Sequence, residues 1–173
     1  QGAAEGIEVG ATVDNAVSIV SRQLRNHGVQ LRIFRSEGEL FISGNRINLE
    51  QIVLNLVVNA MHALDECGRP DKRIDVYIDR LDGEARLRIR DNGPGIEIDR
   101  MEKLFDPFYT TRKSLEGMGL GLAIVKRFTE GFGGRVGAEN NEDAGACFTL
   151  LIPLDRGSTG QAAGETDEDT VRG

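Results

Sequence analysis

Residues 52–64 read IVLNLVVNAMHAL, an apolar run that is interrupted only by Asn55, Asn59 and His62. Spacings of four and three residues put these three side chains on one face of a helix. A carboxamide that is buried without a hydrogen-bond partner costs about 1 to 3 kcal/mol. The two asparagines therefore indicate that this face meets something polar, unless neighbouring backbone groups satisfy both amides.

The hydrophobic pattern on either side of this helix predicts a chain that mixes helices and strands. Before residue 68 we expect a strand at 7–9, a helix from an N-cap at Thr12 to Gly28, a hairpin of 29–34 with 40–43, and the long helix from a cap at Asn45 to about Asp65. After it we expect a hairpin of 73–80 with 85–90, a short helix at 97–104, a helix at 120–132 that buries Ala123, Ile124 and Phe128, and strands at 135–139 and 146–153. Together they predict a two-layer α/β sandwich, in which three main helices cover one face of a mixed sheet.

Length and composition place these elements in one domain. The 173 residues are 39% hydrophobic and 28% charged, which is typical of a globular chain with its own core. We expect a linker at 1–6, the domain at 7–154, and a disordered acidic tail or linker at 155–173, where apolar periodicity stops. The formal net charge of -7 argues against nucleic acid as the main partner.

Cysteine content and hydropathy favour a cytoplasmic domain. Cys67 and Cys147 stand 80 positions apart with no second cysteine near either, so neither a zinc site nor a disulfide framework is indicated. No stretch approaches 18 uninterrupted apolar residues, and no charged-then-apolar leader opens the chain. A longer parent protein could still be anchored in a membrane.

Two glycine-rich segments follow the asparagine helix. In DNGPGI (91–96) an aspartate leaves a strand, where it can accept a hydrogen bond from an exocyclic amine while the glycines pack against a flat base. In GMGLG (117–121) three alternating glycines open a helix, which leaves backbone N–H groups free to face phosphates. Each has a simpler explanation, because the first suits an ordinary turn and the second a flexible hinge without the Walker spacing.

A third segment, LFDPFYTTRK (104–113), joins aromatic residues to a polar and basic loop that extends to Met118. Phe105 and Phe108 can pin the root of this loop into the core, so that Arg112 or Lys113 swings over a terminal phosphate. Taken singly, either cation is as well explained by a solvated loop. A carboxamide oxygen is also a suitable hard ligand for Mg²⁺, so the four segments together predict a site for a Mg-bound nucleotide.

In this order, over about residues 48–150, these segments closely resemble the catalytic ATP-binding domain of sensor histidine kinases, within the superfamily of gyrase, chaperone, kinase and mismatch-repair ATPases. The matching motifs are NLEQIVLNLVVNAMHAL (48–64) for the N box, DNGPGI (91–96) for the first glycine box, LFDPFYTTR (104–112) for the F box, GMGLGLAIVKR (117–127) for the second glycine box and GACFTLLIP (145–153) for the closing strand. The style of the motifs is most similar to the nitrogen-regulatory and dicarboxylate-transport sensors. The resemblance implies a Bergerat-type sandwich with ATP and Mg²⁺ as cofactors.

The resemblance also implies roles for individual residues. Asn59 would be the Mg²⁺ ligand, Asp91 would contact the adenine amine, and Arg112 would be the basic residue of the lid. The base pocket would contain Gly93 and Gly95, the hinge of the phosphate-side lid Gly117, Gly119, Leu120 and Gly121, and further nucleotide contacts Asn55, His62, Thr110, Thr111 and Lys113. Asn55 and Arg112 are the candidate catalytic residues.

One position differs from the related ATPases of the superfamily, and two others depart from the family's own pattern. Asn55 stands where related ATPases carry a glutamate that activates water, and a carboxamide cannot usefully accept that proton near pH 7, so the sequence favours kinase over ATPase. His62 stands where many members have a lysine, so it is either a phosphate neighbour or a polar residue at the edge of the core. Ala146 replaces a hydroxyl residue that often helps to hold adenine through water.

The phosphoacceptor is missing from this chain. His27 and His62 are followed by Gly28 and Ala63, whereas the acceptor histidine of the family is typically followed by an acidic residue. His27, beside a helix end, is expected to be a C-terminal cap. We therefore expect the dimerisation and phosphoacceptor hairpin to lie N-terminal to Gln1 in a homodimeric parent kinase that signals to a response regulator, and we expect the isolated domain to be monomeric.

Three other functions use the same features. A serine kinase of the anti-sigma type would transfer phosphate to Ser or Thr on another protein. An ATP-hydrolysing conformational switch would need a base that activates water, which Asn55 argues against. A nucleotide-binding module that has lost its chemistry is disfavoured by intact Asn59, Asp91 and lid glycines.

Overall fold

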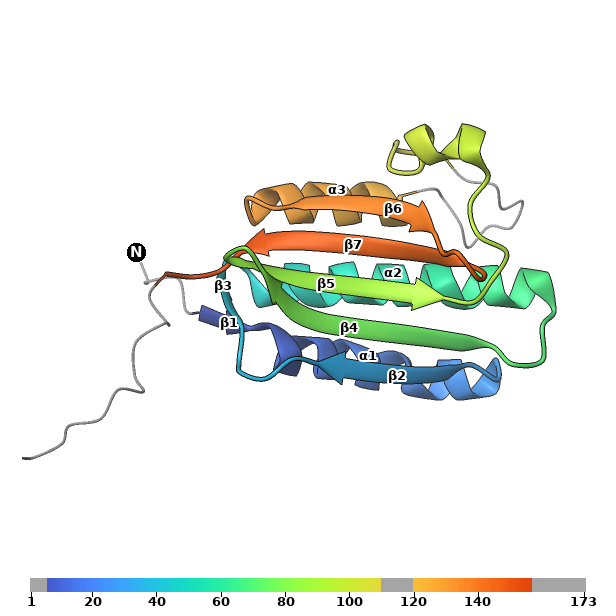
Figure 1. The fold of residues 1–173 in the computed structure, drawn as a ribbon, viewed down its shortest axis with the longest axis horizontal. Helices are drawn as coiled ribbons and strands as arrows, with labels where there is room; N and C mark the ends of the chain where they lie inside the picture. The colour runs from blue at the N-terminus through green and yellow to red at the C-terminus, as the bar shows by residue number, and fades with distance from the viewer. Residues whose placement is uncertain (1–5, 110–119, 157–173) are drawn as a thin grey trace, which may run out of the picture.

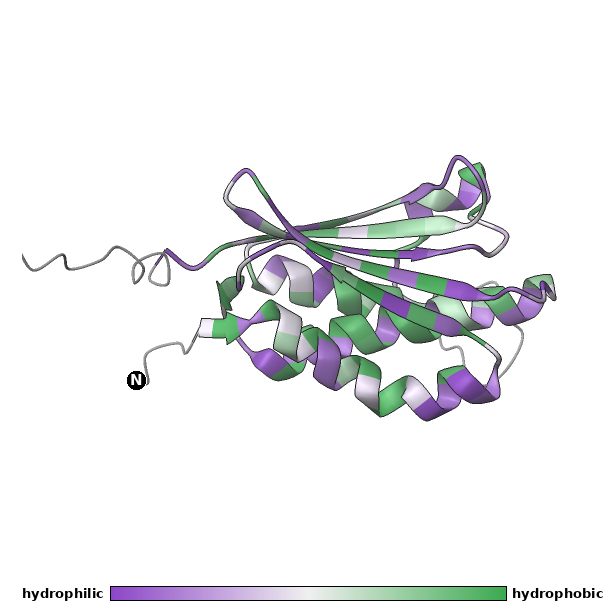
Figure 2. Ribbon diagram, turned by 60° about the horizontal axis from the view of Figure 1, so that its bottom comes forward, coloured by the Kyte–Doolittle hydropathy of each residue, from purple (hydrophilic) through white to green (hydrophobic). Residues whose placement is uncertain are grey.

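The computed structural model describes residues 6–109 and 120–156, which form one layer of helices against a five-stranded sheet (Figure 1). The helices are α1 (Val9–Asn26), α2 (Arg46–Cys67) and α3 (Gly121–Gly131), and a 3₁₀ helix covers Ile98–Lys103. The strands are β1 (Gly6–Glu8), β2 (Gln30–Arg35), β3 (Phe41–Ser43), β4 (Arg73–Leu81), β5 (Glu84–Asp91), β6 (Arg135–Asn140) and β7 (Ala146–Pro153). The three α-helices lie on the same face of the sheet, so the predicted sandwich is confirmed (Figure 2).

The five strands of the main sheet follow the order β2-β4-β5-β7-β6, with β2 parallel to β4 and the other pairs antiparallel. The predicted hairpin of β4 with β5 is confirmed, since Ile74 stands opposite Asp91 and Leu81 opposite Glu84. Burial alternates along β5, because successive side chains of a strand point to opposite faces. Asp91 has the parity of the core residues Leu87 and Ile89, so it ends the strand on the helix-covered side.

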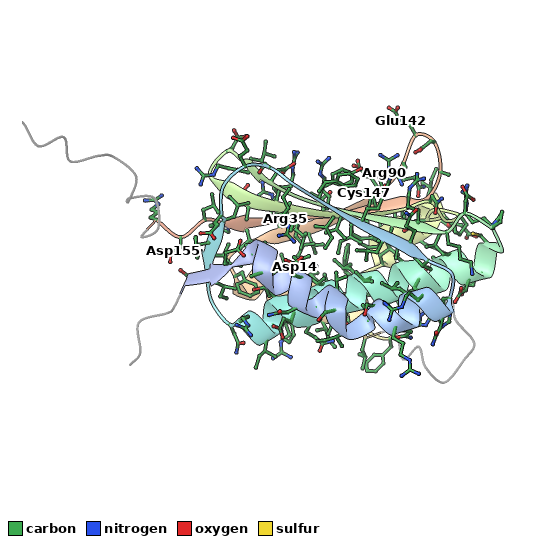
Figure 3. The ribbon with its side chains drawn as sticks, turned by 90° about the horizontal axis from the view of Figure 1, so that it is seen from below. Asp14, Arg35, Arg90, Glu142, Cys147 and Asp155 are labelled. Atoms are coloured by element: carbon green, nitrogen blue, oxygen red, sulfur yellow. The ribbon has the colours of Figure 1, made fainter. Side chains whose placement is uncertain are left out.

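The predicted hairpin of 29–34 with 40–43 is wrong. β2 instead joins the main sheet as the parallel neighbour of β4, and β3 forms a separate antiparallel pair with β1, in which Ile42 stands opposite Ile7. An alternating pattern identifies a strand and its buried face but does not name its partner. An ion pair between Asp14 of α1 and Arg35 of β2 adds a contact between the two layers (Figure 3).

The first helix begins earlier than predicted, because its N-cap is Glu8 and not Thr12. The Glu8 carboxylate accepts hydrogen bonds from the backbone N–H groups of Gly10, at 2.9 Å, and Ala11. Thr12 lies inside the first turn, where its hydroxyl donates to the Glu8 carbonyl at 2.8 Å. Thr12 was the expected cap because short hydroxyl side chains are preferred at this position. Here the longer Glu8 carboxylate reaches the unpaired backbone N–H groups of the first turn.

Helix α2 is the centre of the core. Eight of its side chains are buried: Leu49, Ile52, Val53, Leu56, Val57, Ala60, Met61 and Leu64. It packs against α1 on one side, α3 on the other, and the strands β4 and β5 (Figure 2). Within the described residues it is the one helix long and apolar enough to cross a membrane by length and composition, but here its apolar side chains form the interior of the fold.

Helix α3 is rotated relative to the prediction. Val125 and Thr129 are its fully buried residues, whereas Ala123, Ile124 and Phe128 are only half-buried. Thr129 can be buried because its hydroxyl donates to the Val125 carbonyl at 2.7 Å. Contact with α2 therefore decides which part of the apolar stripe becomes fully buried.

Candidate functional site

The three polar residues of α2 lie in a half-buried line along the helix, as their spacing predicted. Asn55 connects this line to the start of α3, because its side-chain amide donates to the Gly121 carbonyl at 3.2 Å. Its carbonyl oxygen accepts from the Gln51 amide at 2.9 Å. The structure thus brings Asn55 and Gly121 together, although they are 66 positions apart in the sequence.

Asp91 is the buried charged group of this region, with 5% of its surface exposed. Its Oδ1 accepts hydrogen bonds from the backbone N–H of Gly93 at 2.8 Å and of Ala146 at 3.4 Å. Burial raises the pKa of Asp91 above its ordinary value, and the two N–H groups offset part of that effect. Both of these hydrogen bonds are to Oδ1, and within residues 6–109 and 120–156 no group donates to Oδ2.

The first glycine segment lies between Asp91 and the end of α2. A Cβ added at Gly93 would stand 2.9 Å from Asp91 Oδ1, 3.6 Å from Leu64 Cδ2 and 3.7 Å from the Ala63 carbonyl carbon. A side chain at this position would therefore fill the space between the carboxylate and the helix. Gly95 has a φ of +81°, which is the left-handed conformation that glycine adopts readily.

This segment is held in place by side chains that were not among the predicted site residues. Asn92 accepts from the backbone N–H of Arg73 at 2.8 Å and donates to the Asp71 carbonyl at 2.8 Å. Arg69 donates to the Asn92 carbonyl at 2.6 Å. Asn141 donates to the Asp91 carbonyl at 2.9 Å. Only the turn-like composition around these residues could have drawn attention to them, and composition does not tell which backbone group a side-chain amide reaches.

The phosphate side of the predicted site falls largely outside the described residues. Of its candidates, Thr110, Thr111, Arg112, Lys113, Gly117 and Gly119 lie in that undescribed segment. Leu120 and Gly121 lie at its edge, where Leu120 is the N-cap residue of α3. Gly121, the last residue of the 117–121 segment, lies beside the polar line of α2, because its carbonyl accepts from the Asn55 amide.

The aromatic root of the loop is anchored by one phenylalanine instead of two. Phe105 packs against the core with its ring edge-on to Phe148, at a centroid distance of 6.3 Å. Phe108 is 74% exposed and has a φ of +65°, so the prediction that it enters the core is wrong. A positive φ is costly for a large side chain, and this local turn directs the ring away from the core.

The two histidines occupy different places. His27 is the C-cap residue of α1, as predicted, and its ring Nδ1 lies 2.5 Å from Asp65 Oδ2, with Lys72 Nζ at 2.7 Å from the other oxygen. His62 is half-buried at the end of the polar line of α2. Among the described residues, no group of three or more histidine, cysteine, aspartate or glutamate side chains could hold a metal ion.

Comparison with known proteins identifies the family of this chain. Residues 44–156 match the family model described as histidine kinase-, DNA gyrase B- and HSP90-like ATPase. The C4-dicarboxylate transport sensor protein DctB of Pseudomonas aeruginosa is 33% identical over 152 residues, which are 87% of this chain and 25% of that protein. The sensor histidine kinase TmoS of Ectopseudomonas mendocina is 31% identical over 86% of this chain and 15% of its own length.

Solved structures give the same picture. The nucleotide-free catalytic domain of the histidine kinase ThkA superposes with a TM-score of 0.74 and 26% identity, and the match covers 86% of this chain and 93% of that one. Full-length ShkA in complex with AMPPNP also has a TM-score of 0.74 and 26% identity, over 86% of this chain and 30% of its own. The chain spans less than a third of the length of the curated relatives that it matches.

Proposed function

Since the chain belongs to the histidine kinase-, DNA gyrase B- and HSP90-like ATPase family, we propose that it is the catalytic ATP-binding domain of a two-component sensor histidine kinase. It binds Mg-ATP and presents the γ-phosphoryl group to a histidine that lies outside this chain. The observation that carries the proposal is the arrangement around α2, whose polar line is flanked by the first glycine segment at Gly93 and by the start of α3 at Gly121.

The adenine end of the site is formed by Asp91 and Gly93. Oδ2 of a buried carboxylate is a strong acceptor for an exocyclic amine, and burial strengthens the bond by excluding water. The missing side chain at Gly93 keeps the gap between the Asp91 carboxylate and the end of α2 clear, because a Cβ there would stand 2.9 Å from Asp91 Oδ1 and 3.6 Å from Leu64 Cδ2. A flat apolar base fits such a space, because its faces contact carbon atoms while its edge meets the carboxylate.

The metal end of the site is assigned to Asn59. Magnesium usually takes one or two protein ligands and completes its shell with substrate phosphates and water, so a protein-only cluster is not required. Asn59 lies between Asn55 and His62 on the half-buried polar line, and its amide oxygen is a suitable hard ligand. The bound ion would offset charge on the phosphates during transfer. Arg112, Lys113, Thr110 and Thr111 remain candidates for contacts on the lid side.

Asn55 favours transfer over hydrolysis. Its two polar atoms are occupied by Gln51 and Gly121, and a carboxamide is not a useful base for water near pH 7. Asn55 therefore orients the start of α3 at Gly121. Gly117, Gly119, Leu120 and Gly121 remain the candidate phosphate-side residues. The remaining work of this chain is positioning, since phosphoryl transfer depends mainly on in-line geometry and on charge stabilisation.

The acceptor and the partners are assigned to segments and proteins outside this chain. His27 is engaged with Asp65 at the end of α1 and His62 is half-buried on α2, so neither is presented as an acceptor. We assign the acceptor to a dimerisation hairpin N-terminal to this chain, the next phosphoryl carrier to a response regulator, and the domain itself to the cytoplasm.

Two measurements test the proposal. Calorimetric titration with a nonhydrolysable ATP analogue should give binding that is tighter with Mg²⁺ than without it, and Asn59→Ala should abolish the Mg²⁺ dependence. Incubation with labelled ATP should label a separately supplied acceptor hairpin but leave the domain unlabelled, and acid should remove the label. No binding of the analogue would refute the nucleotide site, and an acid-stable label would favour the serine-kinase alternative.

A further inference from the structure

The segment from Asp91 to Ile96 is held by side-chain amides from the turn between β6 and β7. Asn140, the last residue of β6, donates its side-chain N–H to the Ile96 carbonyl at 2.7 Å. Its side-chain oxygen accepts the Ile96 backbone N–H, also at 2.7 Å. One carboxamide thus satisfies both polar groups of a single backbone residue, as a neighbouring strand would do.

The next residue secures the other end of the segment. Asn141 donates its side-chain N–H to the Asp91 carbonyl at 2.9 Å and to the Ala144 carbonyl at the same distance. Its backbone N–H closes the turn by donating to the Gly145 carbonyl at 2.9 Å. The turn therefore contacts the glycine segment at its first and last residues, Asp91 and Ile96.

Glycines allow the turn to approach this closely. A Cβ at Gly145 would lie 2.0 Å from the Asp91 carbonyl oxygen, and a Cβ at Gly95 would lie 2.8 Å from the Asn140 side-chain oxygen. Both glycines have a positive φ, +85° and +81°. The two loops are thus in backbone contact, and the position of one determines the position of the other.

We propose that Asn140 is a positioning residue for the base site, acting through Ile96, and that Asn141 supports it at Asp91. This inference rests on the proposed function. The glycine segment has to keep the space beside Gly93 open and to aim Asp91 Oδ2 before the base arrives. Without the Asn140 clamp the segment samples other conformations, and the fraction of molecules that can bind the base falls.

The exposure of the clamp separates this role from a role in folding. Asn140 is exposed, so water can replace both of its hydrogen bonds to Ile96 when the side chain is removed. Asn140→Ala should therefore leave the domain folded, with a melting temperature close to that of the wild type. It should lower the affinity for ATP and ADP by the same factor, about 5- to 30-fold, because both nucleotides share the base.

The experiment measures the affinities of the 173-residue chain for ATP, ADP and inorganic tripolyphosphate, together with amide hydrogen exchange at Ile96. Asn140→Ala should lower the affinity for both nucleotides and leave the affinity for tripolyphosphate unchanged. It should also accelerate amide hydrogen exchange at Ile96. Asn140→Asp keeps the acceptor for the Ile96 N–H but loses the donor to its carbonyl, so it should recover part of the affinity. Glu142→Ala is the matched control, because this side chain of the same turn points away from the sheet (Figure 3).

The outcomes distinguish this inference from the proposed function. If the wild-type chain binds neither ATP nor ADP, the nucleotide site itself is refuted. If the wild type binds the nucleotides and Asn140→Ala binds them equally well, the positioning role alone is wrong. The same holds if Asn140→Ala lowers the affinity for tripolyphosphate as much as the affinity for the nucleotides. A loss of affinity in Glu142→Ala as large as that in Asn140→Ala would also overturn it.

Discussion

Replacing Asp91 with asparagine separates the charge of this residue from its hydrogen bonds to the backbone. The amide oxygen of Asn can still accept from the N–H groups of Gly93 and Ala146, so the local structure is retained. The amide nitrogen then stands where Oδ2 was, and it presents donors where the carboxylate presented an acceptor. The substitution therefore removes the proposed contact to the adenine amine with little change in shape.

The expected effects on binding and on stability have opposite signs. A hydrogen bond to a charged group contributes about 1.5 to 3 kcal/mol, so the affinity for ATP should fall by about 10- to 150-fold. Burial raises the pKa of Asp91, which means that the folded state disfavours the ionised form at neutral pH. Asp91→Asn should therefore leave the free energy of unfolding unchanged or increase it.

The assay combines ATP and GTP titrations with denaturant unfolding of the same preparations. Asp79→Asn is the control, because Asp79 is held by Arg86 at 2.6 Å and by Arg88 at 3.1 Å on the uncovered face of the sheet. The hydrogen bond from Arg86 lowers the pKa of Asp79, so this control should lose stability and keep its affinity for ATP. An Asp91→Asn variant that keeps its preference for ATP over GTP, or that loses stability as Asp79→Asn does, would refute the assignment of Asp91 to the base.

Three further predictions follow from individual residues. Gly145→Ala should lower the free energy of unfolding by about 3 kcal/mol or more, because its Cβ would clash with the Asp91 carbonyl. Gly28 has a similar φ but nothing within 4 Å, so Gly28→Ala should lower the free energy of unfolding by only about 1 kcal/mol in the same denaturant titration. ADP affinity should fall as the pH drops through the raised pKa of Asp91, and calorimetry at several pH values should find a weaker dependence in Asp91→Asn. Burial alone would raise the pKa of Asp65, but hydrogen bonds from Lys72 and the neighbouring imidazole bring it below its usual value. Asp65 therefore contributes stability that is present above its unfolded pKa and is lost as the pH falls through its folded pKa. Thermal melts should therefore find the wild type more stable than Asp65→Asn near neutral pH, with the difference disappearing in acid.

Much of the fold was readable from local sequence patterns. The alternation of residues 73–80 and 85–90 predicted the β4–β5 hairpin, and the spacing of Asn55, Asn59 and His62 predicted a polar line on α2. These patterns are reliable because the period of side chains along a helix or a strand is a property of the local backbone. The same argument predicted that Asp91 leaves a strand, which is where the structure has it.

What the sequence determined by itself is therefore which residues form each element and which face of the element is apolar. Only the tertiary structure decided that β2 pairs with β4 and not with β3, that Glu8 caps α1, and that amides at 140 and 141 hold the segment that begins at Asp91. The physical reason is that hydrogen-bond partners distant in sequence are chosen by the packing of whole layers. No local period encodes which of several equally polar side chains will lie within 3 Å of a given backbone group.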